Sequence, residues 1–340
     1  MLCRVRNLPG SISTSAFSNR SLQGRARLLS QHPQRFFNKM AQASPCVPKH
    51  TAQWDMSSSQ GVKYQIMISY PIQWKFEKEG DFSGKKANVI YVTDGNAFFF
   101  STMEAVRRKA CCAWAAPDVI VVGIGYQMKD TIWVWDEQRR VDLTPPCEMG
   151  EWPPGHDGKP HKTPYGGADK LLDFIQDELK PFVKTQALPG VTVDEETLWG
   201  HSYGGLFALH ALFTRADMFD YYVAASASVE WNSQFIIKEE TAWLAEPEKE
   251  GAKKRRLALF WGGNEQPAVR GKLQTDEQWE TRKRIAEIAR QRDYAIEMYE
   301  RLEKSGRFEK LEMKEYPKED HVSVTGCAIE GGITFSQGQF

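Results

Sequence analysis

The chain has 340 residues, of which 41% are hydrophobic and 26% are charged. This composition is that of an ordinary globular protein and excludes the disordered and fibrous classes. No apolar run approaches the roughly 18 residues of a membrane-spanning helix, so we predict no membrane span.

The formal net charge of zero conceals an uneven distribution. Residues 1–54 contain eight Lys or Arg and no acid, which leaves 36 basic and 44 acidic residues in the rest of the chain. A region with this acidic excess is poorly suited to bind a phosphate backbone, and it carries no nucleic-acid motif. We therefore expect no nucleic-acid partner.

Residues 1–50 are interpreted as a leader. The first 40 residues are rich in Arg and Ser and lack acids, which is typical of a mitochondrial transit peptide. The alternative is a disordered leader, with synthesis starting at Met40. The expected location is the cytoplasm, or the mitochondrion if the leader is translated. The six cysteines show neither a Cys-x-x-Cys pairing nor zinc-finger spacing, which favours free thiols in a reducing compartment.

Short apolar strands alternate with amphipathic helices after residue 50. Strands are predicted at residues 62–70, 87–93, 119–123, 197–199, 257–261 and 311–316, and helices at 168–185, 206–213 and 276–304. This alternation is typical of an α/β fold with a mostly parallel central sheet and helices on both faces. Because there is no internal repeat and no second core, we predict one domain over residues 51–340.

A serine between two glycines lies where the strand at 197–199 meets the helix at 206–213. The sequence Gly200-His-Ser202-Tyr-Gly204 has the G-x-S-x-G spacing of a nucleophile elbow, a turn so tight that its flanking positions must lack side chains. The predicted nucleophile is Ser202. The alternative is a glycine-rich turn with a structural serine.

A serine nucleophile needs a base, and chain order selects one of the seven histidines. His156 and His161 precede the serine, against the serine, acid, histidine order of this type of site. His201 lies within the elbow, and His210 is expected to pack along the following helix. His321 follows the last predicted strand and is the predicted base.

The third member should orient the imidazole, and chain order places it between the serine and His321. Glu265 follows the strand at 257–261 and is the predicted acid. Asp276 is the alternative, while Asp320 is too close to His321 in sequence. A serine–histidine pair with no acid also remains open.

The oxyanion of an acyl-transfer reaction needs two preorganised N–H donors. The backbone of Tyr203 supplies one, and Gly95 or Asn96, in the loop after the strand at 87–93, is predicted to supply the other. We expect Asp94 to cap the helix that follows this loop rather than to contact substrate.

Residues 131–146 follow a strand end and are therefore expected to overhang the active edge. Arginines beside tryptophans can hold an anionic or oxygen-rich ligand, so the predicted substrate contacts are Trp133, Trp135, Arg139 and Arg140. The alternative is an ion pair of either arginine with Asp136 or Asp142. The loop with His156, Asp157 and His161 offers no metal-ligand geometry, and there is no P-loop or dinucleotide fingerprint. We expect neither a metal nor an organic cofactor.

Five segments together resemble the enterobactin-esterase-like branch of the α/β-hydrolases. They are Tyr91-Val-Thr-Asp-Gly-Asn-Ala97, Arg140-Val-Asp-Leu-Thr-Pro145, Gly166-Gly-Ala-Asp169, Gly200-His-Ser-Tyr-Gly-Gly205 and Ala224-Ala-Ser-Ala-Ser-Val-Glu-Trp-Asn232. Within this branch, Thr51-Ala-Gln-Trp-Asp55 is similar to fungal esterases that hydrolyse triacetylfusarinine C. The likeness covers about residues 51–335 and is more specific for the branch than for the substrate.

The resemblance implies a serine esterase that hydrolyses ester bonds of a hydroxamate or catecholate siderophore and releases its iron inside the cell. In relatives the arginine that matches Arg140 contacts the siderophore, and some bacterial members use serine and histidine alone. The chain departs from the family at Ser226-Ala227-Ser228, where Ser-Pro-Ser is frequent, and at Glu230, which replaces a common Trp. Both departures flank the pocket.

Two rival functions share parts of this pattern. A general carboxylesterase or S-formylglutathione hydrolase would have the same elbow and chain order. A non-catalytic hydrolase relative that only binds a ligand would retain the fold. The sequence leaves the oligomeric state open.

Overall fold

The computed structural model describes residues 46–76, 78, 80–112, 116–128, 134–146, 148, 164–248, 251 and 253–337. The chain divides into two units, residues 1–49 and residues 50–340. The helices and strands described here all belong to the second unit. Trp133, His156, Asp157 and His161 lie outside the described residues.

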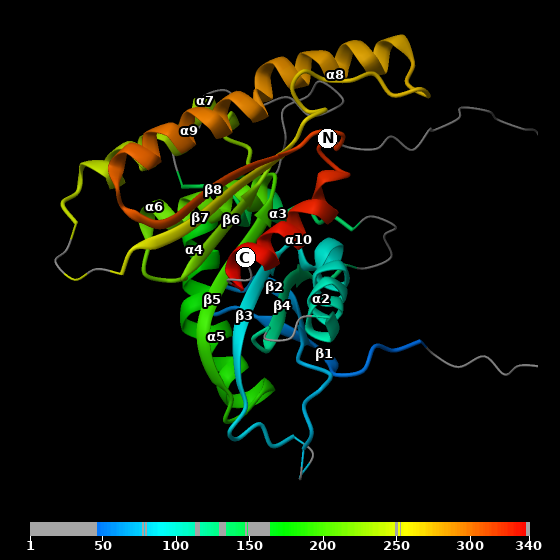
Figure 1. Cartoon of the computed structure of the whole chain (residues 1–340), viewed down its shortest axis with the longest axis vertical. Helices are drawn as coiled ribbons and strands as arrows, with labels where there is room; N and C mark the ends of the chain where they lie inside the picture. Colours follow the sequence, from blue (N-terminus) through cyan, green and yellow to red (C-terminus); the bar gives the residue numbers. More distant parts are fainter. Residues whose placement is uncertain are drawn as a thin grey trace, which may run out of the picture. The chain divides into compact units, whose positions relative to one another are not determined.

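An eight-stranded sheet forms the centre of the second unit (Figure 1). Its strands are β1 (Thr51–Ser57), β2 (Lys63–Ser69), β3 (Lys86–Thr93), β4 (Val119–Tyr126), β5 (Thr192–His201), β6 (Tyr221–Ala225), β7 (Arg255–Gly262) and β8 (Phe308–Tyr316). They lie in the order β1-β2-β4-β3-β5-β6-β7-β8. β2 pairs antiparallel with β1 and β4, and all neighbours from β4 to β8 pair in parallel.

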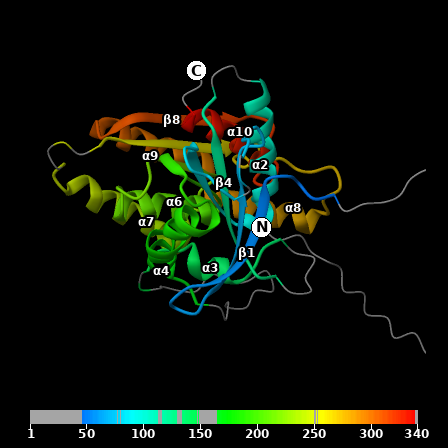
Figure 2. The ribbon, with the colours of Figure 1, turned by 90° about the horizontal axis from the view of Figure 1, so that it is seen from below.

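Helices cover both faces of this sheet. They are α2 (Gly95–Cys112), α3 (Gln138–Asp142), α4 (Ala168–Asp173), α5 (Lys180–Phe182), α6 (Tyr203–Thr214), α7 (Trp231–Ala245), α8 (Asp276–Ala289), α9 (Gln291–Ser305) and α10 (Val324–Ser336), with π-helical turns η1 (Phe174–Leu179) and η2 (Val183–Ala187). α2 and α10 pack on one face, while α4 and α6 pack on the other (Figure 2). The predicted α/β-hydrolase architecture is confirmed.

Alternation along the central strands explains why both faces are covered. In β3 the side chains of Val89 and Tyr91 enter the core beneath α4 and α6, whereas Ile90 and Val92 enter the core beneath α2 and α10. Every residue of β4 is buried, as expected of a parallel strand with helices on both sides. The apolar runs that predicted strands at 87–93 and 119–123 are therefore strands with two covered faces.

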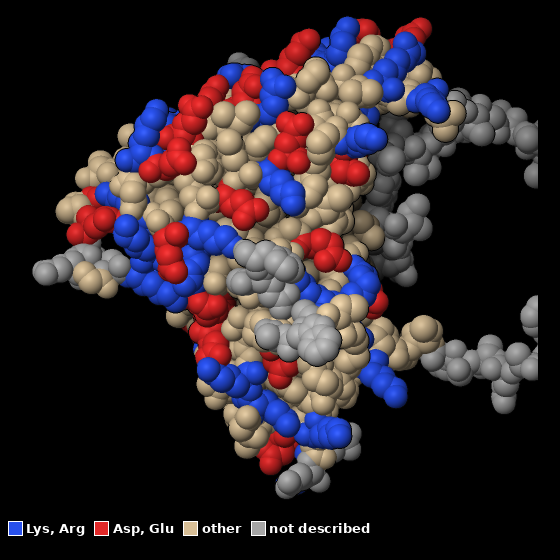
Figure 3. Space-filling view, viewed as in Figure 1, with Lys and Arg blue, Asp and Glu red and all other residues tan. Residues whose placement is uncertain are grey.

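The predicted helix over residues 276–304 is wrong in one respect, because the chain breaks it into α8 and α9. Arg290 between them adopts the left-handed conformation at φ 40°. α9 buries Tyr294, Met298 and Leu302 against the sheet, whereas α8 buries no residue and extends beyond the sheet (Figure 1). A straight helix of this length could not keep its apolar stripe on the sheet. On the face seen in Figure 3, acidic and basic side chains alternate along these helices.

A buried histidine joins three helices beneath the sheet. The His210 side chain in α6 is 1% exposed, and its Nδ1 lies 2.9 Å from Glu239 of α7 while its Nε2 lies 3.3 Å from Asp169 of α4. Burial alone would lower the pKa of His210, but the hydrogen bonds and charges of Asp169 and Glu239 outweigh it and raise this pKa. His210 is thus a packed and paired residue, as predicted.

We expect His210 to make the protein less stable in alkaline solution. A raised histidine pKa stabilises the folded state fully below the unfolded value of about 6.5, and this stabilisation is lost as the pH rises through the folded pKa. Urea unfolding of wild type and His210→Gln at pH 6 and pH 9 measures the effect. The loss of unfolding free energy between the two pH values should be smaller in the variant, and an equal loss in both proteins would contradict the assignment.

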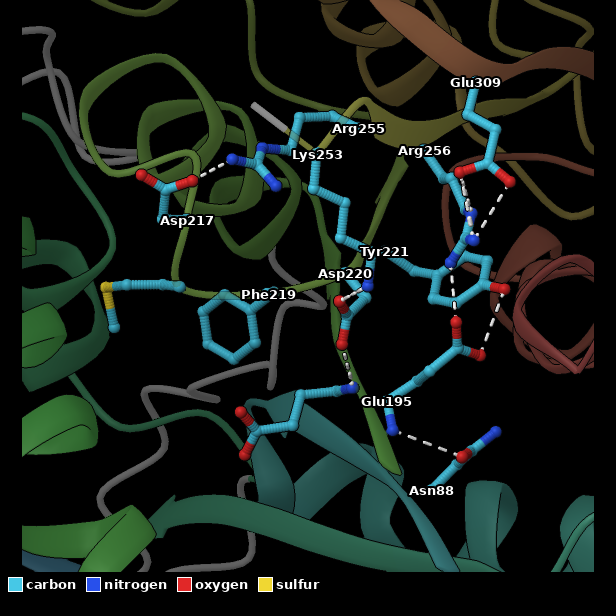
Figure 4. A network of polar contacts seen from close by, with 12 residues as sticks. Asn88, Glu195, Asp217, Phe219, Asp220, Tyr221, Lys253, Arg255, Arg256 and Glu309 are labelled. Atoms are coloured by element: carbon cyan, nitrogen blue, oxygen red, sulfur yellow. Dashed lines mark hydrogen bonds and ion pairs between the residues drawn. The ribbon is translucent and has the colours of Figure 1, made fainter. Parts of the chain in front are cut away.

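The amino-terminal ends of β5 to β8 carry a network of ion pairs (Figure 4). Arg256 bonds Glu195 at 2.7 Å and Glu309 at 3.0 Å, while Arg255 pairs with Asp217 and Lys253 pairs with Asp220 (Figure 4). A cavity of about 620 Å³ opens beside Arg255 and Lys253, at the sheet edge opposite the ends that carry the predicted nucleophile. We assign no function to this cavity, because its cations already have partners. Lys253, Arg255 and Arg215 form ion pairs with carboxylates, and Arg307 donates to backbone carbonyls.

Candidate active site

Ser202 stands in a strained turn between β5 and α6. Its backbone has φ 58° and ψ −116°, a conformation that residues with a side chain rarely adopt and that costs about 1–3 kcal/mol. A Cβ atom at Gly200 would lie 2.0 Å from the Gly204 carbonyl oxygen, and one at Gly204 would lie 2.3 Å from Thr93 Oγ1. Both positions therefore require glycine, and the predicted elbow is present in the structure.

The two predicted oxyanion donors lie at neighbouring helix ends. β3 and β5 pair in parallel, so the N-terminus of α2 at Gly95 and that of α6 at Tyr203 leave the same sheet edge. The first N–H groups of a helix have no acceptor within the helix and are available to an anion. The side chain of Asn96 is engaged with the backbone of Tyr126 through bonds of 2.7 and 3.1 Å. Only its backbone N–H could serve as a donor.

Glu265 and His321 are joined directly. His321 Nδ1 lies 2.6 Å from Glu265 Oε2, and the two side chains are 20% and 3% exposed. The other carboxylate oxygen accepts hydrogen bonds from Ser226 Oγ at 2.6 Å and from the Gly262 N–H at 2.7 Å. This contact fixes the imidazole through Nδ1 and leaves Nε2 for a proton from the nucleophile.

The two other acids considered for this role are placed elsewhere. The Asp320 carboxylate accepts the backbone N–H groups of Val322 and Ser323, within its own turn. The Asp276 side chain is 91% exposed and pairs with Arg270. Among the described residues, Glu265 is therefore the acid that the geometry supports.

In this structure the Ser202 hydroxyl bonds a neighbouring serine rather than His321. Ser202 Oγ lies 3.4 Å from Ser228 Oγ. The ring of His201, one residue before the nucleophile, lies 4.6 Å from the His321 ring. The base is thus next to the elbow. Catalytic hydrogen bonds are often long or absent without a ligand.

Arg139 binds Asp94, which was predicted from the sequence to cap α2. Its Nε and Nη2 donate to the two oxygens of Asp94 at 2.7 and 2.9 Å. Asp94 lies at the start of α2, as predicted, and its carbonyl accepts the Ala97 and Phe98 N–H groups, but its carboxylate binds Arg139. The alternative pairing of Arg139 with Asp136 or Asp142 is wrong. The guanidinium also lies 5.1 Å from the Trp135 ring and 5.3 Å from the Tyr203 ring. The Arg139 guanidinium therefore contacts both Trp135 and Tyr203, the residue that follows the nucleophile.

The other charged residues near Arg139, Asp142 and Arg140, have partners of their own. Asp142 accepts from Tyr64 at 3.0 Å and from Gln138 at 2.8 Å, and burial raises its pKa to about 6. Arg140 lies 3.6 Å from Glu137, and its charge influences the phenols of Tyr165 and Tyr203. The role of Arg140 in substrate binding stays a prediction.

Breaking the Asp94–Arg139 pair should destabilise the protein strongly. Asp94→Asn leaves a buried guanidinium without its counter-charge, which typically costs about 3–5 kcal/mol. Urea unfolding at pH 7 measures the loss. The matched control is Glu330→Gln, which breaks the half-exposed pair with Arg108 and should cost less than about 1 kcal/mol. Equal losses in both variants would contradict the buried role of the pair.

The contacts that Ser226 and Ser228, in the loop after β6, make with Glu265 and Ser202 were not predicted from the sequence. Ser226, at φ 42°, donates to Glu265, and Ser228 lies beside the nucleophile. The sequence marked these positions only as departures from the family pattern. A strand prediction at β6 would have placed them on the active edge.

No group of three or more His, Cys, Asp or Glu side chains in the described part of the chain could hold a metal ion. No helix within the same residues is long and apolar enough to cross a membrane.

The fold, the elbow and the His321–Glu265 pair together define a serine hydrolase of the α/β-hydrolase type. Residues 57–302 match the family described as putative esterase. The chain belongs to this esterase family.

Individual relatives share most of their length with this chain. It is 41% identical to a siderophore enterobactin esterase from Emericella nidulans over 86% of this chain and 95% of the relative. It is 36% identical to a siderophore triacetylfusarinine C esterase from Aspergillus fumigatus over 86% and 94%. The solved structure of siderophore hydrolase EstA from Aspergillus nidulans is 40% identical, with a TM-score of 0.81 over 88% of this chain and 97% of that one.

Proposed function

We propose that the protein is an esterase that hydrolyses the backbone esters of a siderophore of the triacetylfusarinine C type. The observation that carries the chemistry is the strained Ser202 beside a histidine whose Nδ1 is bound by a buried carboxylate. The substrate class is supported by the two fungal relatives, both named for siderophore esters. The ferric ion is cargo of the substrate, and its release inside the cell is part of the proposal.

The reaction proceeds in two acyl transfers. His321 Nε2 accepts the proton of Ser202, whose Oγ attacks the ester carbonyl carbon and forms a tetrahedral oxyanion. The N–H groups of Tyr203 and of Gly95 or Asn96 stabilise this oxyanion, a contribution of about 2.7–4 kcal/mol for each donor. The imidazolium returns the proton to the departing alcohol oxygen.

Water then completes the cycle. His321 takes a proton from a water molecule, whose oxygen attacks the acyl carbon. The imidazolium then returns this proton to Ser202 Oγ as the bond between Oγ and the acyl carbon breaks and the acid is released. Glu265 stabilises the imidazolium in both halves. Arg140 is proposed to contact the oxygen-rich siderophore, together with Trp133 and Trp135. Arg139 is proposed to act indirectly, since its guanidinium is occupied by Asp94.

The test is product analysis with pure substrates. Wild type is incubated with ferric and with iron-free triacetylfusarinine C, with enterobactin, and with small acyl thioesters, and products are identified by mass. Cleavage of triacetylfusarinine C to its hydroxy-acid units supports the proposal. Turnover confined to the catecholate ester would reassign the substrate, and turnover confined to thioesters would overturn the siderophore proposal.

A further inference from the structure

Ser226, in the loop after β6, has a backbone conformation that glycine would adopt at lower cost. Its φ is 42°, in the left-handed region, where the Cβ atom of any other residue crowds a backbone carbonyl oxygen. The residue is only 1% exposed, so its hydroxyl is also withdrawn from water. Glycine at this position would avoid both the strain and the buried hydroxyl. A strained residue of this kind at an active edge indicates that its side chain has a function there.

The backbone places Ser226 between the strand of the nucleophile and the strand of the acid. β6 ends at Ala225 and pairs in parallel with β5 on one side and with β7 on the other. The Ala225 carbonyl accepts the Ser202 N–H at 2.9 Å. The Ser226 N–H donates to the Phe260 carbonyl of β7 at 2.7 Å. Ser226 is thus held through its backbone beside the strand that leads to Glu265.

The Ser226 hydroxyl binds the oxygen of the acid that does not contact the base. Ser226 Oγ donates to Glu265 Oε1 at 2.6 Å, the length of a charge-assisted O–H···O bond. The Gly262 N–H donates to the same oxygen at 2.7 Å. The other oxygen, Oε2, lies 2.6 Å from His321 Nδ1. Two donors therefore hold one carboxylate oxygen, and the second oxygen is directed at the imidazole.

Two donors on one oxygen fix the plane of the carboxylate. The last bond of a glutamate side chain joins an sp³ carbon to an sp² carbon, so rotation about it has only broad minima. With the Gly262 N–H as the single donor, the carboxylate could turn about that contact and displace Oε2 from the imidazole. The Ser226 hydroxyl comes from a different strand end and opposes this rotation. The alignment of Glu265 with His321 therefore depends on Ser226.

We propose that Ser226 is a positioning residue for the reaction at Ser202. Its hydroxyl orients the Glu265 carboxylate, which in turn holds His321 in the tautomer whose Nε2 accepts the proton of the nucleophile. The inference rests on the proposed ester hydrolysis and deepens it, because it assigns a further residue to the same site. It also explains why a strained serine is retained where glycine would be at ease.

The first test separates the hydroxyl from the backbone conformation. Ser226→Gly removes the hydroxyl and relieves the left-handed strain, whereas Ser226→Ala removes the hydroxyl and keeps the strain. Hydrolysis of 4-nitrophenyl acetate and of triacetylfusarinine C gives kcat/KM, and thermal unfolding gives Tm. We expect both variants to lose about 10-fold in kcat/KM, as for a lost hydrogen bond to a charged group. Ser226→Gly should nevertheless have a Tm about 2 °C or more above that of Ser226→Ala. A purely structural role would instead make activity follow stability.

The second test asks whether Ser226 acts through Glu265. In a Glu265→Gln background, the further change Ser226→Gly should alter kcat/KM by less than about 2-fold, because residues that act as one unit have non-additive effects. The matched control is Ser336→Ala, which removes another buried serine hydroxyl, at the C-terminal end of α10. This control should keep kcat/KM within about 2-fold of its parent in both backgrounds.

The outcomes separate this inference from the proposed function. Wild-type kcat/KM in Ser226→Gly would overturn the role of Ser226, and so would a loss that recurs in full in the Glu265→Gln background. Wild type that cleaves 4-nitrophenyl acetate but not triacetylfusarinine C would refute the siderophore substrate alone, because the model ester still measures the effect of Ser226. Wild type that cleaves neither ester would refute the esterase and overturn the positioning role with it.

Discussion

Replacing Ser202 by alanine is expected to lower kcat for ester hydrolysis by about 10⁴- to 10⁶-fold, the range found when a nucleophile of this kind is removed. Without Oγ no acyl-enzyme can form, and only the oxyanion donors and substrate binding remain to assist water. The measurement is steady-state hydrolysis of triacetylfusarinine C at substrate concentrations well above KM, so that the fall is assigned to kcat.

The fold should survive this substitution, because the hydrogen bond that Ser202 Oγ makes within the described part of the chain, to Ser228 Oγ, is long at 3.4 Å. Labelling by a fluorophosphonate probe supplies an independent readout. Wild type and the control Ser101→Ala, on the exposed face of α2, should be labelled, and Ser202→Ala should not. Labelling that persists in Ser202→Ala would show that another residue is the nucleophile.

Replacing Glu265 by glutamine should lower kcat by about 10³- to 10⁴-fold, as expected when the orienting acid of a triad becomes an amide. The carboxylate accepts from three donors: His321 Nδ1, Ser226 Oγ and the Gly262 N–H. A glutamine offers one oxygen and two N–H donors, so it cannot accept from all three. It would favour the tautomer of His321 that carries its proton on Nε2, where the base must be empty.

The control for this variant is Asp276→Asn, since Asp276 was the alternative acid and is almost fully exposed. Its kcat should stay within about 3-fold of wild type, as for most surface substitutions. Activities are compared below the unfolding temperature of each protein, because Glu265 is buried and its loss also affects stability. A Glu265→Gln enzyme with nearly wild-type kcat would favour a serine–histidine pair without an acid.

Much of the fold follows from local sequence pattern. The six predicted strands lie within or overlap β2, β3, β4, β5, β7 and β8. In β3, β4 and β7 burial between two helical layers imposes continuous apolar runs, whereas the edge strand β8 has no buried residue. β1 and β6 were missed. β1 has one neighbour and no fully buried residue, and the five residues of β6 pass directly into the loop that carries Ser226. The break at Arg290 was also missed, since no glycine marks it and packing of α9 imposes it.

The elbow at Ser202 and the contact between Glu265 and His321 could be predicted, because each residue follows a strand and their order in the chain is read from the sequence. The partner of Arg139 could not. Asp94 lies 45 residues away, and the contact exists because the end of β3 and α3, which contains Arg139, meet in the folded chain. For the same reason the spacing of acids and arginines within residues 131–146 suggested a partner for Arg139 inside this segment, whereas its guanidinium binds Asp94. Local spacing indicates which residues are present but does not identify their partners.

The bond between Asp94 and Arg139 also connects two tasks of the site. Asp94 is directly followed by Gly95, a predicted oxyanion donor, and Arg139 is directly followed by Arg140, the predicted substrate contact. A ligand that draws Arg140 toward itself therefore pulls, through one buried ion pair, on the N–H that must meet the developing negative charge. Binding of a remote part of the substrate at Arg140 would in this way help to position the oxyanion donor at the reacting carbon. Esters that bind Arg140 weakly should therefore show a lower kcat as well as a lower affinity.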